Sequence, residues 1–353
     1  MKHRNNAAKL RGVRANLETK RAETEYAVDV ENLAIKYVTM AHTVEAVNNV
    51  SFKLKKKCSL GLVGETGAGK TSTMLALLNM VPNPPGVIEE GKILVNGLNI
   101  LELSPAELQC VRGKEIAMIF QDPMTSLNPV FTVGDQIAES VMIHQECSHA
   151  EAIARAKEML EKVGIDPARS GEYPHQFSGG MRQRVGIAIA LACQPTVLIA
   201  DEPTSALDVT IQAQVLDMMK ELKDTMDTAL ILITHDLGVV AELCDEVAVM
   251  YAGRIVEKGT LEELFENTKH PYTEGLFNSL PNVNDRTQKL TPISGAMPDP
   301  SNLPKGCAFA DRCPYATDAC REEIPEYIAF SDTHMVACTA YRDPAFHIRR
   351  GAK

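Results

Sequence analysis

The eight residues GETGAGKT, at 64–71, constrain the fold of this 353-residue chain more than any other stretch. They follow the apolar run SLGLV (59–63), which predicts a buried strand, and precede TSTMLALLNM (71–80), which predicts a helix. Small residues let backbone N–H groups point at a polyphosphate, while Lys70 supplies a cation and Thr71 a hydroxyl for Mg²⁺. A glycine-rich turn without a ligand is the alternative. Because a helix N-terminus favours anions, the strand–loop–helix order favours nucleotide binding.

Composition excludes several classes of protein. The formal net charge is −10 and the pI is near 5.5, so the chain lacks the overall basic field that would hold nucleic acid. The longest apolar run, VGIAIALAC (185–193), is half of the ~18 residues that a membrane span needs. The N-terminus has no signal-peptide pattern. We therefore expect a cytosolic protein, in which the nine cysteines form no disulfide framework.

Alternating strands and helices predict an α/β fold. The segments VDVENLAIKYV and NVSFKL alternate apolar and polar residues, as half-buried strands do. A mostly helical stretch fills about 122–190 and includes EAIARAKEMLEKVG. Short apolar runs predict further buried strands with helices between them, an order typical of a mainly parallel sheet, at 115–121, 196–201, 229–234 and 246–251.

We predict three parts in the chain. Residues 1–26 are polar and basic, 27–269 form the nucleotide-binding domain, and 270–353 form a small, proline-rich, irregular module with four cysteines. The N-terminal extension is most simply a frayed or partly helical segment. The alternative is a basic arm that contacts anionic lipid headgroups or a partner.

Two carboxylates follow a predicted buried strand in VLIADE (197–202). Such a strand delivers Asp201 and Glu202 to its C-terminal edge, where ligands of open α/β sheets bind. Asp201 suits Mg²⁺, and Glu202 suits the orientation or polarisation of an attacking water. Gln121 in FQDP and His235 in LITHD also follow predicted strands. Taken alone, Gln121 is as readily a surface glutamine, and His235 is more often a structural histidine.

A second anion-binding helix start is predicted at FSGGMRQRVGIAIALA (177–192). Ser178 is a good N-cap, and the two glycines after it let backbone amides approach an anion. A capped helix after a turn is the simpler interpretation. One chain with two phosphate cradles and one nucleotide suggests that the second cradle serves the nucleotide of a neighbouring subunit.

In this order, the motifs resemble those of the ATP-binding cassette (ABC) ATPases over roughly 28–268. GETGAGKT resembles the Walker A motif, VLIADE Walker B, Gln121 the Q-loop, SGGM the signature, SALD (205–208) the D-loop and His235 the switch histidine. The resemblance implies a RecA-like, mainly parallel sheet with antiparallel strands and a helical subdomain. It also implies site residues: for ATP, Tyr37 on the adenine and Gly64, Thr66, Gly67, Gly69, Lys70, Thr71 and Ser72; for Mg²⁺, Thr71, Gln121 and Asp201; for catalysis, Glu202, His235 and Gln121; for the partner's ATP, Ser178, Gly179, Gly180 and Met181; and, in the D-loop, Ser205 and Asp208.

The same resemblance implies partners. In the family, two such domains close head to tail around ATP and pass conformational work to membrane subunits through the helical insertion. Met181 stands where the family most often has glutamine, and SGGM is similar to the D-type ATPase of oligopeptide and dipeptide importers. That implies a heterodimer with a second ABC ATPase, two permease subunits, a solute-binding protein and a place on the cytoplasmic face of the inner membrane. A homodimer is the alternative.

Four cysteines stand in the C-terminal module at spacings of five, six and seventeen residues: Cys307, Cys313, Cys320 and Cys338. Structural zinc sites usually use tight Cys-x₂₋₄-Cys pairs, which are absent here. The looser spacing suits an iron–sulfur cluster better, and zinc or free thiols are the alternatives. HPYTEGL and GCAFADRCPY also resemble the C-terminal module of the same importer family, which implies a [4Fe–4S] cluster that staples the module.

The leading hypothesis is an ATPase subunit that drives import of dipeptides or oligopeptides, with nickel or another small solute as the alternative cargo. A non-transport ABC ATPase would act on nucleic acid or translation, which the acidic charge disfavours. A plain nucleotide-dependent kinase would explain 64–71 but would leave SGGM, SALD and His235 without a role.

Overall fold

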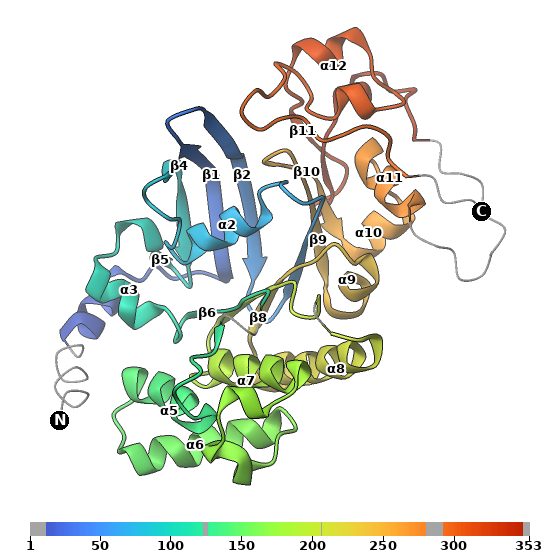
Figure 1. The fold of residues 1–353 in the computed structure, drawn as a ribbon. Helices are drawn as coiled ribbons and strands as arrows, with labels where there is room; N and C mark the ends of the chain where they lie inside the picture. The colour runs from blue at the N-terminus through green and yellow to red at the C-terminus, as the bar shows by residue number, and fades with distance from the viewer. Residues whose placement is uncertain (1–11, 123–125, 206, 280–291, 349–353) are drawn as a thin grey trace.

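Two β-sheets organise the chain. The computed structural model describes residues 12–122, 126–205, 207–279 and 292–348. The smaller sheet is antiparallel, in the order β2-β1-β4-β5, and consists of β1 (Tyr26–Val38), β2 (Thr43–Lys55), β4 (Gly86–Val95) and β5 (Leu98–Asn99). Figure 1 shows it on one side of the molecule, with α2 (Lys70–Leu77) against it.

The larger sheet has the order β11-β12-β10-β9-β3-β8-β7-β6. Its five strands from β9 to β6 are parallel, and β10, β12 and β11 continue it antiparallel. All residues of β3, β7 and β8 are buried, because both faces of the sheet are covered. The strands are β3 (Ser59–Val63), β6 (Ile116–Ile119), β7 (Val197–Asp201), β8 (Ala229–Ile233), β9 (Glu246–Tyr251), β10 (Arg254–Thr260), β11 (Tyr327–Ala329) and β12 (Met335–Ala337).

Helices form a subdomain below the large sheet in the view of Figure 1. The subdomain contains α5, α6 and α7, whose bounds are given below. Its predicted limits of about 122–190 stay a prediction. Gly164, at φ +72°, follows the end of α6 as expected of a helix stop. The remaining helices are α3 (Pro105–Val111), α5 (Val133–His144), α6 (His149–Lys162), α7 (Gly179–Leu191), α8 (Val209–Met226), α9 (Leu237–Leu243), α10 (Leu261–Glu266), α11 (Pro271–Asn278) and α12 (Asp318–Glu322). In the described ranges no helix is long and apolar enough to cross a bilayer.

The described part of the N-terminal extension packs on the nucleotide-binding domain. Residues 12–20 are helical, and Leu17 is buried in the core beneath the antiparallel sheet. Lys20 pairs with Glu107 at 2.6 Å and Arg21 with Glu115 at 2.8 Å. These two cations are therefore engaged within the chain. Arg14 donates to the carbonyl oxygen of Ile143 at 3.1 Å. Residues 1–11, which carry the other basic residues of the predicted arm, lie outside the described residues.

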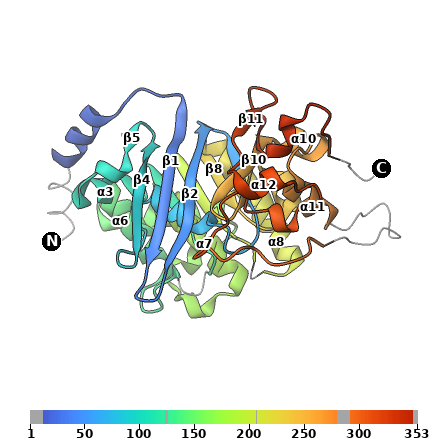
Figure 2. The ribbon, with the colours of Figure 1, turned by 90° about the horizontal axis from the view of Figure 1, so that it is seen from above.

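The C-terminal module is joined to the large sheet through β12, which pairs with β10. The sequence predicts only an irregular segment there, because strands of three residues are too short to show a period. Figure 2 shows the module packed along the side of the sheet that carries β10 and α11. Phe309 and Tyr272, both within 270–353, are buried in the same core as Val63 and Val249, so module and domain share one hydrophobic interior.

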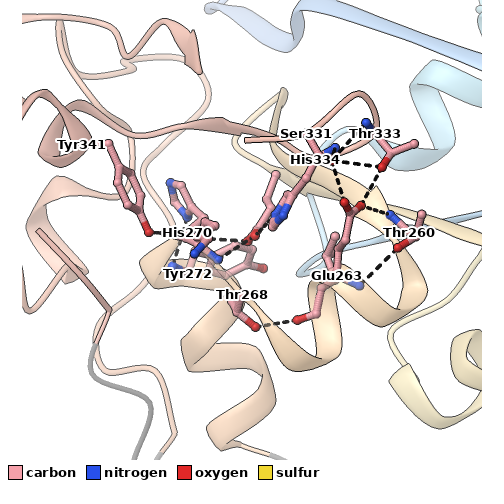
Figure 3. A network of polar contacts seen from close by, with 12 residues as sticks. Thr260, Glu263, Thr268, His270, Tyr272, Ser331, Thr333, His334 and Tyr341 are labelled. Atoms are coloured by element: carbon pink, nitrogen blue, oxygen red, sulfur yellow. Dashed lines mark hydrogen bonds and ion pairs between the residues drawn. The ribbon is translucent and has the colours of Figure 1, made fainter. Parts of the chain in front are cut away.

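A polar network, buried around Glu257 and partly exposed around Glu263, fixes this junction (Figure 3). The carboxylate of Glu257 in β10 accepts from the backbone N–H groups of Lys269, at 2.7 Å, and His270, at 2.9 Å. Its Oε1 also lies 2.8 Å from Nε2 of His334. Beside it, the carboxylate of Glu263 accepts from the hydroxyl of Ser331 at 2.6 Å, from the hydroxyl of Thr333 at 2.9 Å and from a backbone N–H, that of Thr260, at 2.9 Å.

Candidate active site

The phosphate loop has the predicted strand–loop–helix geometry. β3 ends at Val63 and α2 begins at Lys70. Two loop positions require glycine. Gly64 has φ +152°, and a Cβ there would lie 2.1 Å from the carbonyl oxygen of Met250; Gly69 has φ +100°, and its Cβ would lie 2.3 Å from that of Ala46. The sequence prediction for 64–71 is confirmed at the level of backbone structure.

Lys70 is buried, and its Nζ donates to the carbonyl oxygens of Gly64, at 2.7 Å, and Glu65, at 2.9 Å. Burial lowers the pKa of the Lys70 ammonium, while the carboxylates of Glu202, Asp201 and Glu65 oppose that shift. A cation is thus held inside the loop by backbone carbonyls and surrounded by acidic side chains. Thr66 and Gly67 lie exposed at the tip of the same loop.

Walker A and Walker B residues meet at the start of α2. The hydroxyl of Thr71 donates to Oδ2 of Asp201 at 3.1 Å. Asp201 ends β7 and is buried; burial raises the pKa of its carboxyl, and the Thr71 hydrogen bond opposes this. A hydroxyl and a carboxylate side by side are the oxygen ligands that Mg²⁺ prefers, so the residues present fit that ion.

Glu202 lies between the two polar residues predicted on neighbouring strands. Nε2 of Gln121 donates to its Oε2 at 2.7 Å, and Nδ1 of His235 lies 3.1 Å from its Oε1. The backbone of Glu202 has φ +44°, a left-handed conformation that is unusual for this residue type. Its N–H donates to the carbonyl oxygen of Ile233 in β8, at 2.8 Å, which holds the turn in place.

Four predicted site residues lie at one edge of the sheet because β6, β7 and β8 are adjacent and parallel. They are Gln121, Asp201, Glu202 and His235. The carboxyl ends of parallel strands lie on one edge of a sheet, so side chains that follow them converge. The predicted adenine contact belongs to the antiparallel sheet: the hydroxyl of Tyr37, in β1, is 3.1 Å from the hydroxyl of Ser72 in α2.

The signature segment is built as a helix start, as predicted. Ser178 caps α7 and accepts from the N–H of Met181 at 3.4 Å. A Cβ added to Gly179 would meet no atom within 4 Å, whereas a Cβ on Gly180 would lie 2.6 Å from Ile211 of α8. Within the described residues, Ser178, Gly179 and Gly180 make no hydrogen bond with the phosphate loop of the same chain.

The predicted D-loop connects Walker B to α8. The hydroxyl of Ser205 donates to the carbonyl oxygen of Glu202 at 3.2 Å. Asp208 caps α8 and accepts from the N–H of Ile211 at 3.1 Å. Ala206, between them, lies outside the described residues. The D-loop is thus tied to the residue that sits between Gln121 and His235.

The four cysteines of the module line one small cavity together with His270 and Phe309. Cys320 and Cys338 are buried, and none of the four forms a disulfide in the described ranges. The N–H of Cys307 donates to the carbonyl oxygen of Cys320 at 2.7 Å, which ties two of them together. In the part of the chain that the structure describes, no group of three or more His, Cys, Asp or Glu side chains has the arrangement of a metal site.

Sequence reasoning missed a contact between this module and the phosphate loop. Arg312, beside Cys313, makes two hydrogen bonds to the carboxylate of Glu65, at 2.9 and 3.1 Å. The N–H of Glu65 donates to the hydroxyl of Tyr272 in α11 at 2.9 Å. No local pattern signals such a contact, because 247 residues separate Arg312 from Glu65.

Comparison with known proteins agrees with this geometry. Residues 47–205 match the ABC transporter family, and residues 256–320 match the oligopeptide/dipeptide transporter C-terminal region. The chain is 52% identical over 312 residues to the oligopeptide transport ATP-binding protein OppD of Bacillus subtilis, covering 88% of this chain and 87% of OppD. It is 47% identical over 325 residues to the dipeptide transport ATP-binding protein DppD of the same organism, covering 92% of this chain and 97% of DppD.

Solved structures give the same result for the fold. The dimeric, post-hydrolysis ATP-binding cassette MJ0796 bound to ADP and Pi matches with a TM-score of 0.59 and 27% identity, over 66% of this chain and 98% of the cassette. CbiO1 from Clostridium perfringens matches with a TM-score of 0.58 and 26% identity, over 69% of this chain and 92% of CbiO1. The chain therefore belongs to the ABC transporter family, as an ATPase that carries the oligopeptide/dipeptide transporter C-terminal region.

Proposed function

We propose that this chain hydrolyses ATP at the edge of the large sheet and that Glu202 orients the attacking water. The observation that carries the proposal is the position of the Glu202 carboxylate, 2.7 Å from Gln121 Nε2 and 3.1 Å from His235 Nδ1. A carboxylate held from both sides is positioned to accept a proton from water, and His235 would contact the γ-phosphate. The left-handed backbone of Glu202 fits a residue held for catalysis.

The phosphate loop would bind the triphosphate through its backbone N–H groups and Lys70. Thr71, Asp201 and Gln121 would hold Mg²⁺, which neutralises charge on the phosphates when bound. The contact of Thr71 with Asp201 at 3.1 Å supports the first two of these roles. The remaining ATP contacts in this proposal are made by Gly64, Thr66, Gly67, Gly69 and Ser72, with Tyr37 stacked on the adenine.

The second wall of the site would come from another subunit. Ser178, Gly179, Gly180 and Met181 start α7, and the first three make no hydrogen bond with the chain's own phosphate loop among the described residues. An open Gly179 leaves room for a phosphate to approach the backbone amides. Ser205 and Asp208 would transmit closure between the two sites. The dimeric cassette that resembles this chain supports such pairing.

We further propose that ATP hydrolysis drives import of dipeptides or oligopeptides, because the relatives that the chain resembles include peptide transport ATP-binding proteins. The chain would pair with a second, distinct ABC ATPase and dock on two permease subunits at the cytoplasmic face of the membrane. A solute-binding protein would deliver the cargo. In this proposal residues 27–269 hydrolyse ATP, with the helical subdomain at about 122–190 against the permeases, and 270–353 form the appended module.

The four cysteines of the module are proposed to hold a [4Fe–4S] cluster, with zinc as the alternative. Their convergence on one cavity supports this. Burial raises the pKa of the Cys313 thiol to about 11 and that of Cys338 to about 12. Such thiols become thiolate ligands only when a metal compensates for their charge. A cluster there would cross-link the module.

Reconstitution tests the function. The chain, tagged and expressed in its own organism, is isolated with its membrane subunits and placed in proteoliposomes with Mg²⁺ and ATP. If the cargo is peptide, dipeptides or oligopeptides presented by the binding protein should stimulate ATP hydrolysis and accumulate inside. Stimulation by a nickel chelate alone would establish the alternative cargo. Recovery with nucleic acid and without membrane subunits would reject transport.

A further inference from the structure

The C-terminal module reaches the phosphate loop through one arginine. Arg312 follows the buried Phe309 and precedes Cys313. Its side chain is 7% exposed and all of its N–H groups have acceptors. Those acceptors are Glu65 Oε2 at 2.9 Å, Glu65 Oε1 at 3.1 Å, the Tyr251 hydroxyl at 3.2 Å, and the carbonyl oxygens of Ser294 at 3.0 Å and Ile293 at 3.4 Å.

The guanidinium is therefore fixed by contacts within the protein itself. Each of its N–H donors has its own acceptor, so rotation would break several hydrogen bonds at once. Its central carbon also lies 5.8 Å from the ring centre of Tyr251 and 5.9 Å from that of Phe309. These two ring centres are 5.3 Å apart, and Tyr272 packs against both rings. An aromatic cluster thus supports the arginine.

Glu65, the partner of Arg312, carries a negative charge in a loop that binds phosphates. Glu65 is the only acidic residue in the sequence of the loop 64–71, which is built to receive a polyphosphate. An unpaired carboxylate there would repel the phosphates and compete for Lys70. The Glu65 side chain is only 32% exposed, so solvent screens it incompletely. Two parallel hydrogen bonds from Arg312 neutralise it and turn it toward the module.

The backbone of Glu65 is held as well. Its N–H donates to the hydroxyl of Tyr272 at 2.9 Å, and its carbonyl oxygen accepts from Lys70 at 2.9 Å. Met297, also in the C-terminal region, lies against the next glycine of the loop, because a Cβ on Gly67 would be 3.1 Å from its methyl carbon. One side of the loop is consequently formed by residues that follow the nucleotide-binding domain.

We propose that Arg312 is a positioning residue for nucleotide binding: by neutralising and fixing Glu65, it lets the C-terminal module set the affinity of the phosphate loop for ATP. This inference rests on the proposed binding and hydrolysis of ATP. Arg312 acts on the loop and not on Glu202 or its neighbours. The effect therefore falls on Kd and KM for ATP, and the kcat of the bound enzyme stays close to the wild-type value.

The test uses the full chain and four variants. Arg312→Met removes the pair, Arg312→Lys keeps the charge without the two-pronged geometry, and Arg312→Met with Glu65→Gln removes both charges. Arg321→Met is the matched control, because Arg321 lies in the same module but forms an exposed pair with Asp311, with 54% and 81% of the two side chains accessible. The Kd for Mg-ATP is measured by titration calorimetry on the full chain, and KM and kcat by phosphate release from the complex isolated with its membrane and ATPase subunits.

We expect Arg312→Met to raise Kd and KM by about tenfold, with kcat within about twofold of wild type. Arg312→Lys recovers part of the affinity. Adding Glu65→Gln to Arg312→Met recovers most of it, since no carboxylate is then left unpaired. Arg321→Met matches the wild type. Melting curves without nucleotide show whether each variant remains folded.

Two results overturn the inference. One is an Arg312→Met chain that binds ATP as tightly as wild type. The other is an affinity loss that Glu65→Gln leaves unrepaired while the melting temperature drops, which would mean that Arg312 only holds the module together. A wild-type chain that binds no ATP would instead reject the proposed function.

Discussion

Nε2 of His334 lies 2.8 Å from Oε1 of Glu257, and both side chains are buried, with 2% and 0% of their areas exposed. Glu257 belongs to β10 and His334 to the turn before β12, so the pair joins the nucleotide-binding domain to the C-terminal module. The backbone N–H groups of Lys269 and His270 complete the hydrogen bonding of the Glu257 carboxylate.

Removal of one partner should therefore destabilise the junction. We expect His334→Ala to lower the free energy of unfolding by about 3 kcal/mol, since it leaves a buried carboxylate without its side-chain partner. Chemical denaturation gives this value. Glu323→Gln, which breaks the exposed pair with Arg342, is the control and should cost less than about 1 kcal/mol. An equal loss of unfolding free energy in the two variants would contradict the expectation that breaking the buried pair costs more than breaking the exposed one.

Glu202→Gln should nearly stop hydrolysis. The amide keeps the shape of the side chain but cannot accept a proton, so phosphate release should fall by about two to four orders of magnitude. ATP binding, measured by calorimetry, should persist, because Lys70 and Thr71 are untouched. Glu242→Gln, on the exposed face of α9, is the control. Turnover that survives the change would reject Glu202 as the residue that orients water.

Ser178→Arg should separate binding from hydrolysis. The single chain should still bind ATP, whereas the assembled dimer should lose most of its turnover because the second wall of the site is blocked. Ser148→Arg is the matched control, because Ser148 is the N-cap of α6 as Ser178 is of α7. Loss of either cap costs about 1 kcal/mol of helix stability. A Ser178→Arg chain with full turnover, or full turnover by a strict monomer, would disprove the shared site.

Metal content distinguishes the proposals for the cysteines. Purified without oxygen, the wild-type chain should be brown and contain about four iron atoms, and Cys320→Ser should lose both colour and iron. Cys193→Ser is the control, because Cys193 follows α7 and does not line the cavity of the four cysteines. Colourless protein with one zinc per chain would establish the alternative. Metal-free protein would leave the thiols as packing groups.

Acid should destabilise the chain through His144. Burial is the main cause that lowers the pKa of His144 to about 4, and the charges of Arg14 and Lys114 add to it. Because the unfolded residue titrates near its ordinary value of 6.5, the folded state binds fewer protons below that pH. The contribution of neutral His144 to the free energy of unfolding is complete above pH 6.5. It decreases as the pH falls toward 4, and the total loss is on the order of 3 kcal/mol.

Unfolding measured at several pH values tests this. His144→Gln should flatten the decline between pH 6.5 and 4, and His42→Gln, at an exposed position, should leave it unchanged. If the free energy of unfolding falls equally with pH in His144→Gln and wild type, His144 is not the cause of the decline.

Local sequence was sufficient for the nucleotide-binding elements. GETGAGKT after SLGLV predicts β3, the loop and α2, because glycine spacing and a short apolar run act over fewer than about 20 neighbouring residues. The same holds for β6, β7 and β8, whose polar residues Gln121, Asp201 and His235 the sequence places at the ends of strands. Strand–helix alternation makes those strands parallel, and the carboxyl ends of parallel strands share an edge.

Tertiary structure alone decided how the C-terminal region acts. The strands β11 and β12 have three residues each, too few for a period, and they exist because β10 offers an edge to pair with. Arg312 and Glu65 are ordinary charged residues in the sequence, and 247 positions separate them. Only the packing of Phe309, Tyr272 and Tyr251 brings that guanidinium to the phosphate loop, because such contacts depend on which distant surfaces bury each other.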